Sequence, residues 1–114
     1  MPLNDTVVLL GQSQTASESD ELGRILARNF IRTLAQSELK PAMLIFVNAG
    51  VFLACEGSEI LEELQQLSVA GVAVLSCGTC VDFFKVRDKV QAGSISNMQV
   101  IVEKLLTAHH VIRF

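Results

Sequence analysis

Short apolar runs alternate with amphipathic stretches along this chain. Residues 6–10, 43–48 and 72–75 are rich in apolar and β-branched side chains, which predicts three buried strands. Two further runs, at residues 90–95 and 111–114, predict a weaker fourth strand and a fifth strand that closes the chain. Strands of this length that are apolar throughout are typical of a sheet covered on both faces.

The first interval between strands carries a helix-forming pattern. Apolar side chains recur at helical spacing through residues 22–34, and Ser17 with Asp20 offers an imperfect capping box before them. A second stripe of this helix is basic, with arginines four residues apart at positions 24, 28 and 32. That stripe fits a solvated face, or a face that docks a phosphate or a partner.

Helices are also predicted in the later intervals. Ser58 starts a second helix, and Gly71 stands where a left-handed helix end is expected. A shorter amphipathic stretch covers residues 81–89, and Ser96 or Asn97 caps a last helix. Strands that alternate with helices predict βαβ units and right-handed crossovers. We therefore expect one three-layer α/β/α domain over residues 1–114, flavodoxin- or Rossmann-like, with a mostly parallel sheet of about five strands.

Composition narrows the class of protein. The chain has 114 residues, half of them hydrophobic, and a mean hydropathy of +0.43, which excludes a disordered chain. No apolar run approaches the roughly 18 residues of a membrane-spanning helix, so we expect no membrane insertion. Nine basic against twelve acidic residues give a net charge of −3, which argues against a nucleic-acid partner. An apolar share this high in so small a domain favours a homo-oligomer.

Cysteine usage indicates the compartment. The chain has three cysteines, an odd number, and no pattern of a signal peptide, so a secreted disulfide framework is not expected. The predicted location is the cytoplasm.

Ligands of open α/β sheets bind beyond the carboxyl ends of the strands. The segments that leave those ends hold all three cysteines; they are residues 11–19, 48–58, 76–80 and 96–97. His109 and His110 fall at the opposite end of the predicted sheet, so we interpret them as exposed turn residues.

The pair Cys77 and Cys80, with Gly78 and Thr79 between, is the most informative motif. A thiolate is the nucleophile of sulfur chemistry, and a helix N-terminus favours it. Gly78 permits a tight turn that aims the side chains outward. A zinc site needs two further ligands and only Cys55 is near, so we expect no metal. Two other interpretations of the motif remain open: a thioredoxin-like redox site, or two buried cysteines with a structural role.

Three further features flank this motif. Asn48 and Asn97 follow the second and fourth strands, where each side chain either donates to a persulfide or anion or caps its own segment. The apolar run at residues 51–54 lies where a loop is expected, which predicts that it covers the cysteine site or enters a subunit interface. Cys55 ends that run, as a packed free cysteine or as a third thiol that accepts sulfur.

The sequence around the motif resembles the DsrE/DsrF-like family of sulfur-relay proteins. It is most similar to the C-terminal domain of YedF-type proteins, which are sulfurtransferase-like and linked to selenium metabolism. Residues 72–77, a buried strand that ends in cysteine, carry the resemblance to the family, and the segments shared with YedF-type proteins are residues 46–51, 56–58, 76–80 and 93–98. The resemblance covers nearly the whole chain and implies a dimer or trimer that carries persulfide sulfur on Cys77, with no cofactor. Cys80 then resolves or shields that sulfur.

Two departures limit what the resemblance implies. YedF-type proteins have an upstream TusA-like domain with a Cys-Pro pair, and no Cys-Pro occurs here, so we expect any TusA-like carrier to act in trans. The Arg-Gly pair that follows the sulfur cysteine in relay members is also missing, and the next basic residue is Lys85. Whether the chain is an active sulfurtransferase, a non-catalytic binding or assembly module, or a thiol-disulfide redox protein stays open.

Overall fold

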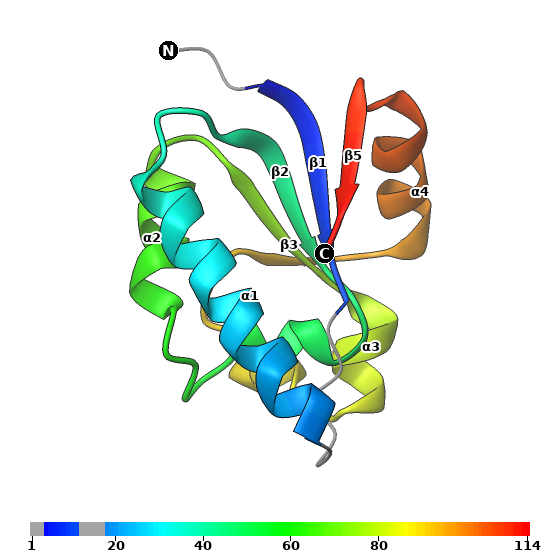
Figure 1. Ribbon diagram of the computed structural model, residues 1–114. Helices are drawn as coiled ribbons and strands as arrows, with labels where there is room; N and C mark the ends of the chain where they lie inside the picture. The colour runs from blue at the N-terminus through cyan, green and yellow to red at the C-terminus, as the bar shows by residue number, and fades with distance from the viewer. Residues whose placement is uncertain (1–3, 12–17) are drawn as a thin grey trace.

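The computed structural model describes residues 4–11 and 18–114. A parallel sheet forms its centre (Figure 1), and its order in this part of the chain is β4-β3-β2-β1-β5. The strands are β1 (Asn4–Leu10), β2 (Pro41–Phe46), β3 (Ala73–Cys77), β4 (Ser94–Ser96) and β5 (His110–Arg113). The predicted mostly parallel sheet is confirmed.

Helices cover both faces of the sheet (Figure 1). Helices α1 (Glu18–Gln36) and α2 (Leu61–Val69) pack on one face, and α4 (Met98–Thr107) packs on the other. A short helix, α3 (Gly78–Phe83), follows β3, and two 3-10 helices complete the chain: η1 (Asn48–Ala54) and η2 (Arg87–Lys89). The α/β/α layering expected from the sequence is therefore confirmed.

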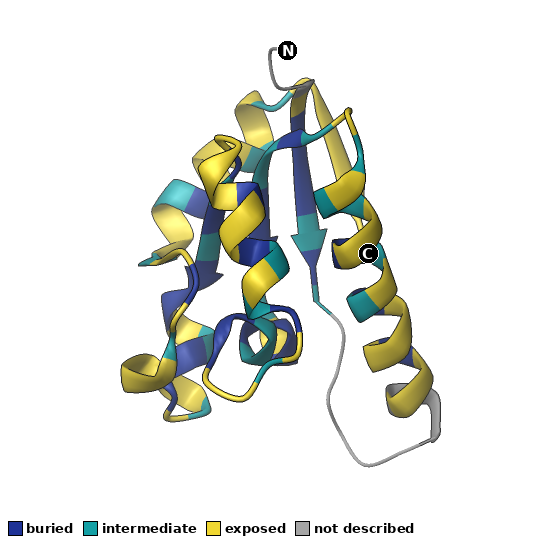
Figure 2. Ribbon diagram, turned by 90° about the vertical axis from the view of Figure 1, so that its left-hand side faces the viewer, coloured by how far each residue is buried: buried dark blue, intermediate teal, exposed yellow. Residues whose placement is uncertain are grey.

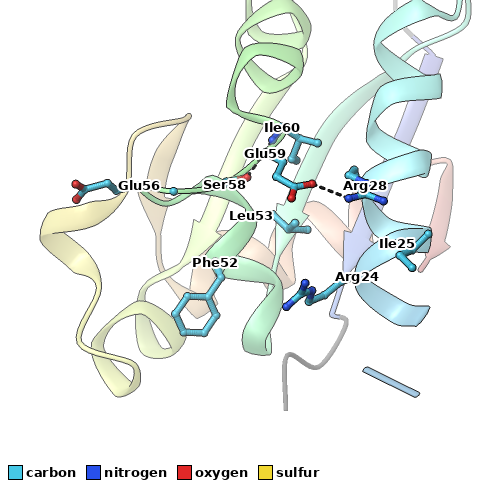
Figure 3. A pocket seen from close by; sticks show the side chains of 10 residues that line it. Arg24, Ile25, Arg28, Phe52, Leu53, Glu56, Ser58, Glu59 and Ile60 are labelled. Atoms are coloured by element: carbon cyan, nitrogen blue, oxygen red, sulfur yellow. Dashed lines mark hydrogen bonds and ion pairs between the residues drawn. The ribbon is translucent and has the colours of Figure 1, made fainter. Parts of the chain in front are cut away.

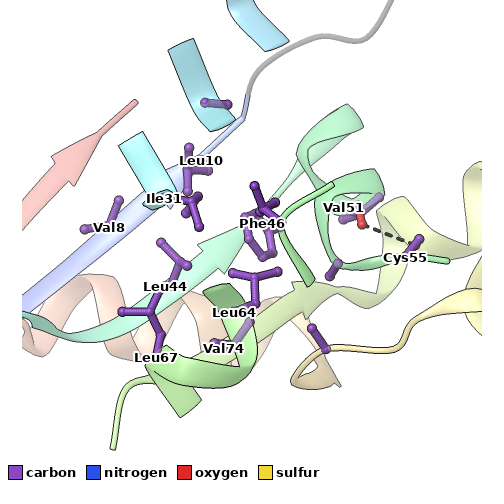
Figure 4. Close-up of a cluster of buried hydrophobic side chains, with 14 of the residues drawn as sticks. Val8, Leu10, Ile31, Leu44, Phe46, Val51, Cys55, Leu64, Leu67 and Val74 are labelled. Atoms are coloured by element: carbon purple, nitrogen blue, oxygen red, sulfur yellow. Dashed lines mark hydrogen bonds between the residues drawn. The ribbon is translucent and has the colours of Figure 1, made fainter. Parts of the chain in front are cut away.

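The larger hydrophobic core lies between the sheet and helices α1 and α2 (Figure 4). Phe46 is its largest fully buried side chain, and Leu10, Ile31, Leu44 and Leu64 pack around it without exposure to solvent. These residues come from two strands and two helices, so this core holds the layers together. Buried residues follow the inner strands β1, β2 and β3, and exposed ones the outer sides of the helices (Figure 2).

The second core, on the α4 face, is smaller. It consists of Val7, Ile45, Cys77 and Ile101, with partly buried neighbours around them. Along α4, by contrast, Met98, Val102 and Leu106 are exposed, as are Val111 and Ile112 on the edge strand β5. The α4 side of the sheet therefore carries exposed apolar side chains on both α4 and β5.

Several predicted helix and strand ends are confirmed. Gly71 has a positive φ of 102° after α2. The side chain of Asn97 caps α4, because its oxygen accepts a hydrogen bond from the backbone N–H of Val100 at 2.9 Å. The proposed capping residue Ser17 lies outside the described residues.

Other ends differ from the prediction. Helix α2 begins at Leu61 and not at Ser58. The fourth strand contains only Ser94–Ser96, because Gly93 has a positive φ of 70° and so does not continue the extended backbone. A Cβ at Gly93 would also lie 2.1 Å from the carbonyl oxygen of Val74 in β3. Val90, at the start of the predicted strand, instead forms an isolated antiparallel bridge with Cys55.

The arginine stripe of α1 is largely exposed, as expected of a solvated face, and two of its residues form ion pairs at the surface. Arg28 bonds Glu59 at 2.6 Å and Arg32 bonds Glu63 at 3.1 Å, so two of its three arginines connect α1 to α2 and the loop before it. Arg28 holds the pKa of Glu59 below its usual value.

Candidate functional site

The two cysteines of the Cys-Gly-Thr-Cys segment lie at the carboxyl end of the sheet, as predicted. Cys77 is the last residue of β3, and Cys80 is the third residue of α3. His110 begins β5 and pairs in register with Thr6 near the start of β1, so the histidines lie at the other end. There the rings of His109 and His110 contact each other edge to face, with their centroids 4.7 Å apart.

Cys77 is buried, with 1% of its surface exposed. Side chains alternate along a strand, and the Cys77 thiol points to the α4 face, where it packs with Val7, Ile45 and Ile101. The expectation that Gly78 aims both side chains outward is therefore wrong for Cys77. Its backbone is held by β4, since Cys77 is in register with Ser96.

Cys80 is partly exposed and contacts both hydrophobic cores. Its Sγ accepts a hydrogen bond from the backbone N–H of Asn48 at 3.1 Å, and the thiol of Cys77 lies beside it. The two thiols are thus adjacent, and Cys80 is the one that solvent reaches.

Burial raises the pKa of the Cys80 thiol, and the neighbouring thiol of Cys77 raises it further. Within the described chain, the influence that opposes this rise is the backbone N–H of Asn48 and not a cation. The expected thiolate-favouring effect of a helix N-terminus does not dominate, because α3 has only six residues and Cys80 lies against two apolar clusters.

Asn48 approaches the thiol through its backbone. It adopts a left-handed conformation with a φ of 51°, which asparagine tolerates better than most residues, two residues after the end of β2. This turn directs its N–H to Cys80, while its side chain is exposed. Asn97, in contrast, uses its side chain to cap α4. The structure therefore brings Asn48 to the thiol pair and gives Asn97 a capping role.

Gly78 and Thr79 form the turn between the cysteines. A Cβ at Gly78 would lie 2.7 Å from the backbone oxygen of Ser96, so glycine is required there by close packing against β4. Thr79 is exposed on the same turn.

Cys55 does not join the pair. Its thiol is 3% exposed, belongs to the larger core and donates a hydrogen bond to the carbonyl oxygen of Val51 at 3.2 Å. Burial raises its pKa, and the charge of Lys89 acts in the opposite direction. Of its two predicted roles, the packed free cysteine is confirmed. Among residues 4–11 and 18–114, no group of three or more His, Cys, Asp or Glu is arranged to hold a metal ion.

The apolar run at residues 51–54 is part of η1. Val51 and Ala54 are fully buried inside the chain, and the ring of Phe52 lies 4.9 Å from that of Phe84, just after α3. Since η1 begins at Asn48, this segment does lie beside the cysteine turn. The buried Val51 and Ala54 are not available for a subunit interface.

Sequence reasoning missed an ion pair beside the turn. Arg87 bonds both carboxylate oxygens of Asp82, at 2.7 and 3.0 Å, and lowers the pKa of that carboxyl. Its guanidinium also lies against the turn, since a Cβ at Gly78 would be 3.5 Å from Arg87 Nη2. The spacing of five residues between Asp82 and Arg87 fits no helical pair, so their positions along the chain carry no signal of this ion pair.

Ser76 is a second residue that the sequence did not single out by itself. Its hydroxyl is fully buried directly before Cys77, and within the described residues it has no hydrogen-bond partner. Its register partner is Phe46, so it faces the larger core, on the side of β3 opposite to the Cys77 thiol.

A parallel α/β sheet with a thiol pair at the carboxyl end of an inner strand defines a class of small thiol-bearing α/β proteins. Within that class, the chain belongs to the DsrE/DsrF-like family, whose model matches residues 10–114. This family is associated with sulfur relay, and its members are generally oligomeric. The narrower similarity to YedF-type proteins stays a prediction.

Solved structures share the fold. The ychN protein from E. coli superposes with a TM-score of 0.67 at 20% identity, over 98% of this chain and 100% of that one. The protein of unknown function MTH1491 from Methanobacterium thermoautotrophicum gives 0.66 at 19% identity, over 96% and 97%. BT1422 from Bacteroides thetaiotaomicron gives 0.60 at 17%, over 96% and 95%. The comparison with curated proteins found no match. No helix of the described residues is long and apolar enough to cross a membrane.

Proposed function

We propose that this chain handles sulfur as a persulfide carrier, with the Cys77–Cys80 pair as its site. The observation that supports the proposal most is the partly exposed Sγ of Cys80, which receives the backbone N–H of Asn48 while a second thiol lies beside it. A backbone donor aimed at sulfur stabilises negative charge there in the thiolate and in the persulfide alike.

Exposure favours Cys80 as the residue that accepts sulfur first. The family resemblance points to Cys77 as the carrier, but Cys77 is packed in the smaller core. We therefore assign the first reaction to Cys80, and to Cys77 the role of the adjacent thiol that shields the loaded sulfur.

Transfer of sulfur from a donor persulfide to Cys80 requires no added oxidant or reductant. The Cys80 thiolate attacks the terminal sulfur of a donor persulfide, RS–SH. A bond forms between Cys80 Sγ and that sulfur, the donor's S–S bond breaks, and the donor leaves as the thiolate RS⁻. Delivery is the same exchange with an acceptor thiolate as the attacking group, and it restores the Cys80 thiolate.

The raised pKa of Cys80 argues against a thioredoxin-like redox protein. Reactive redox cysteines of the Cys-X-X-Cys type have a lowered pKa, whereas burial raises that of Cys80. The same observation supports a second candidate function, a binding or assembly module that keeps the family fold and whose thiols are unreactive.

The proposed setting of this activity is the cytoplasm, where thiols stay reduced. A TusA-like carrier in trans is the proposed donor. A homo-oligomer, dimer or trimer, fits the exposed apolar side chains of α4 and β5, among them Leu106, which is 80% exposed. Light scattering is expected to give a mass at least twice 12.4 kDa; a monomer at tens of micromolar contradicts the oligomer alone.

The site is tested by loading reduced protein with polysulfide and measuring intact mass. We expect wild type and the control Cys55→Ser to gain about 32 Da per sulfur atom, lost on reduction, and Cys80→Ser to gain none. Cys77→Ser is expected to load but to lose the sulfur faster. Full loading of both Cys77→Ser and Cys80→Ser would exclude the pair as the site.

A further inference from the structure

A cavity of about 490 Å³ opens between α1, η1 and the loop before α2 (Figure 3). That volume is in the range of pockets that take small organic ligands, about 300–1,000 Å³. Its apolar wall is formed by Ile25 of α1 and by Phe52 and Leu53 of η1. It is thus a site distinct from the thiol pair, although η1 borders both.

Two arginines, Arg24 and Arg28, line this cavity, and they differ in their partners. Arg28 bonds Glu59 at 2.6 Å, whereas Arg24 forms no ion pair with a side chain of residues 5–11 or 21–114 and acts on Glu59 only through its charge. The carboxylate of Glu56 is directed away from both arginines (Figure 3). The accessible charge over the apolar wall is therefore positive, and Glu59 is already neutralised.

A hydroxyl donor accompanies that cation. Ser58 lines the cavity, and its Oγ accepts a hydrogen bond from the backbone N–H of Ile60 at 3.3 Å. An oxygen that serves as acceptor keeps its own proton for donation. Arg24 and Ser58 thus provide donors at a wall that otherwise consists of aliphatic and aromatic side chains.

We propose that this cavity binds a small amphipathic organic anion. The carboxylate or sulfonate head group bonds to Arg24 and Ser58, and the apolar body packs on Phe52, Leu53 and Ile25. An organic cation is disfavoured there, because the carboxylate of Glu59 is held by Arg28 and that of Glu56 points elsewhere.

The test uses two probes of equal chain length and opposite charge, octanesulfonate and octyltrimethylammonium. Binding to the full chain is measured by calorimetry, and the site is located by amide chemical shifts. We expect the sulfonate to bind with shifts at Phe52, Leu53 and Arg24, and the ammonium to bind at least about tenfold more weakly.

Two matched variants test the role of the free cation. Arg24→Gln is expected to weaken binding of the sulfonate about tenfold, because a charge-assisted hydrogen bond is lost. Arg32→Gln lies on the same stripe of α1 but pairs with Glu63 outside the cavity, so it is expected to change binding less than about twofold. Both side chains are exposed, so neither change removes a core contact.

Three results would overturn the proposal: equal binding of the two probes, equal effects of the two variants, or no binding of the sulfonate up to about 10 mM. Shifts confined to the exposed apolar residues of α4 and β5 would overturn it as well. No sulfur is loaded in this experiment, so its failure leaves the proposed persulfide chemistry of Cys80 unaffected.

Discussion

Cys55 and Cys80 are two thiols whose pKa is raised by burial, yet they take opposite parts in hydrogen bonding. Cys55 donates its S–H to the carbonyl oxygen of Val51, while Cys80 accepts the N–H of Asn48. A donated proton keeps sulfur in the neutral thiol form, whereas an accepted one supports negative charge on it. The pKa is thus raised for both thiols. What distinguishes Cys55, the core thiol, from Cys80, the candidate carrier, is whether the sulfur donates or accepts its hydrogen bond and how far it is exposed.

The largest expected effect is on alkylation rate. In the native protein, iodoacetamide is expected to modify Cys80 more than about 100-fold faster than Cys55, because Cys55 becomes accessible only through an opening that costs about 3 kcal/mol or more. Peptide mass spectrometry at successive times measures both rates. Equal rates in denaturant serve as the control, and equal rates in the folded state would remove the distinction between the two environments.

Gly78→Ala is expected to disturb the Cys80 region specifically. The new Cβ meets the backbone oxygen of Ser96 at 2.7 Å, so we expect a loss of about 1–3 kcal/mol in the free energy of unfolding and a changed alkylation rate at Cys80.

Gly57→Ala is the control for that change, because Gly57 has a φ of 91° but nothing within 4 Å of an added Cβ. It is expected to lose only about 1–2 kcal/mol, from backbone strain, and to leave the alkylation rate unchanged. Chemical denaturation measures both variants. A Gly78 variant as stable and as reactive as wild type would contradict the close packing of this turn.

Replacing each of the two cysteines, Cys55 and Cys80, by alanine tests how much its side chain contributes to the free energy of unfolding. Cys55→Ala is expected to lower the free energy of unfolding by about 1–2 kcal/mol, because a buried contact and its hydrogen bond to Val51 disappear. Cys80→Ala is expected to lower it by less than about 1 kcal/mol, because its surroundings are partly open to water. The reverse order in urea denaturation would mean that Cys80 is the structural thiol.

The smallest expected effect is on pH dependence. Since the folded pKa of Cys55 and of Cys80 is raised, the folded chain holds these protons more tightly than the unfolded chain does. The resulting stability is present below the usual thiol pKa of about 8.5 and is lost as the pH rises through the folded values. Denaturation midpoints are therefore expected to fall more between about pH 7.5 and about pH 10 in wild type than in the double variant Cys55→Ala/Cys80→Ala. An equal fall of the denaturation midpoint in wild type and in the double variant would contradict the raised pKa values of Cys55 and Cys80.

Local patterns in the sequence were enough to predict the layers of the fold. Continuous apolar runs identified the inner strands, and Gly71 and Asn97 marked helix ends through requirements that are local to the backbone. The short fourth strand was not predictable in length, because residue type alone does not reveal that Gly93 takes a positive φ and packs against Val74 of β3.

The candidate site was predicted in position but not in orientation. The motif and the rule for parallel sheets placed Cys77 and Cys80 at the correct edge. Which face the Cys77 thiol takes depends on the strand register, and a strand that is apolar on both faces carries no signal of it. The N–H of Asn48 and the guanidinium of Arg87 reach the turn through backbone conformation and tertiary packing, which residue type does not reveal.

The central claim is that the Cys77–Cys80 pair carries sulfane sulfur, and the most direct test is the mass of the protein as cells make it. Protein purified without reductant is alkylated at once, and intact and peptide masses are measured before and after reduction. We expect an added mass of about 32 Da on the peptide that holds Cys77 and Cys80, attached at Cys80 and removed by reductant. A loss of about 2 Da, which marks a disulfide, or masses that reduction leaves unchanged would contradict it.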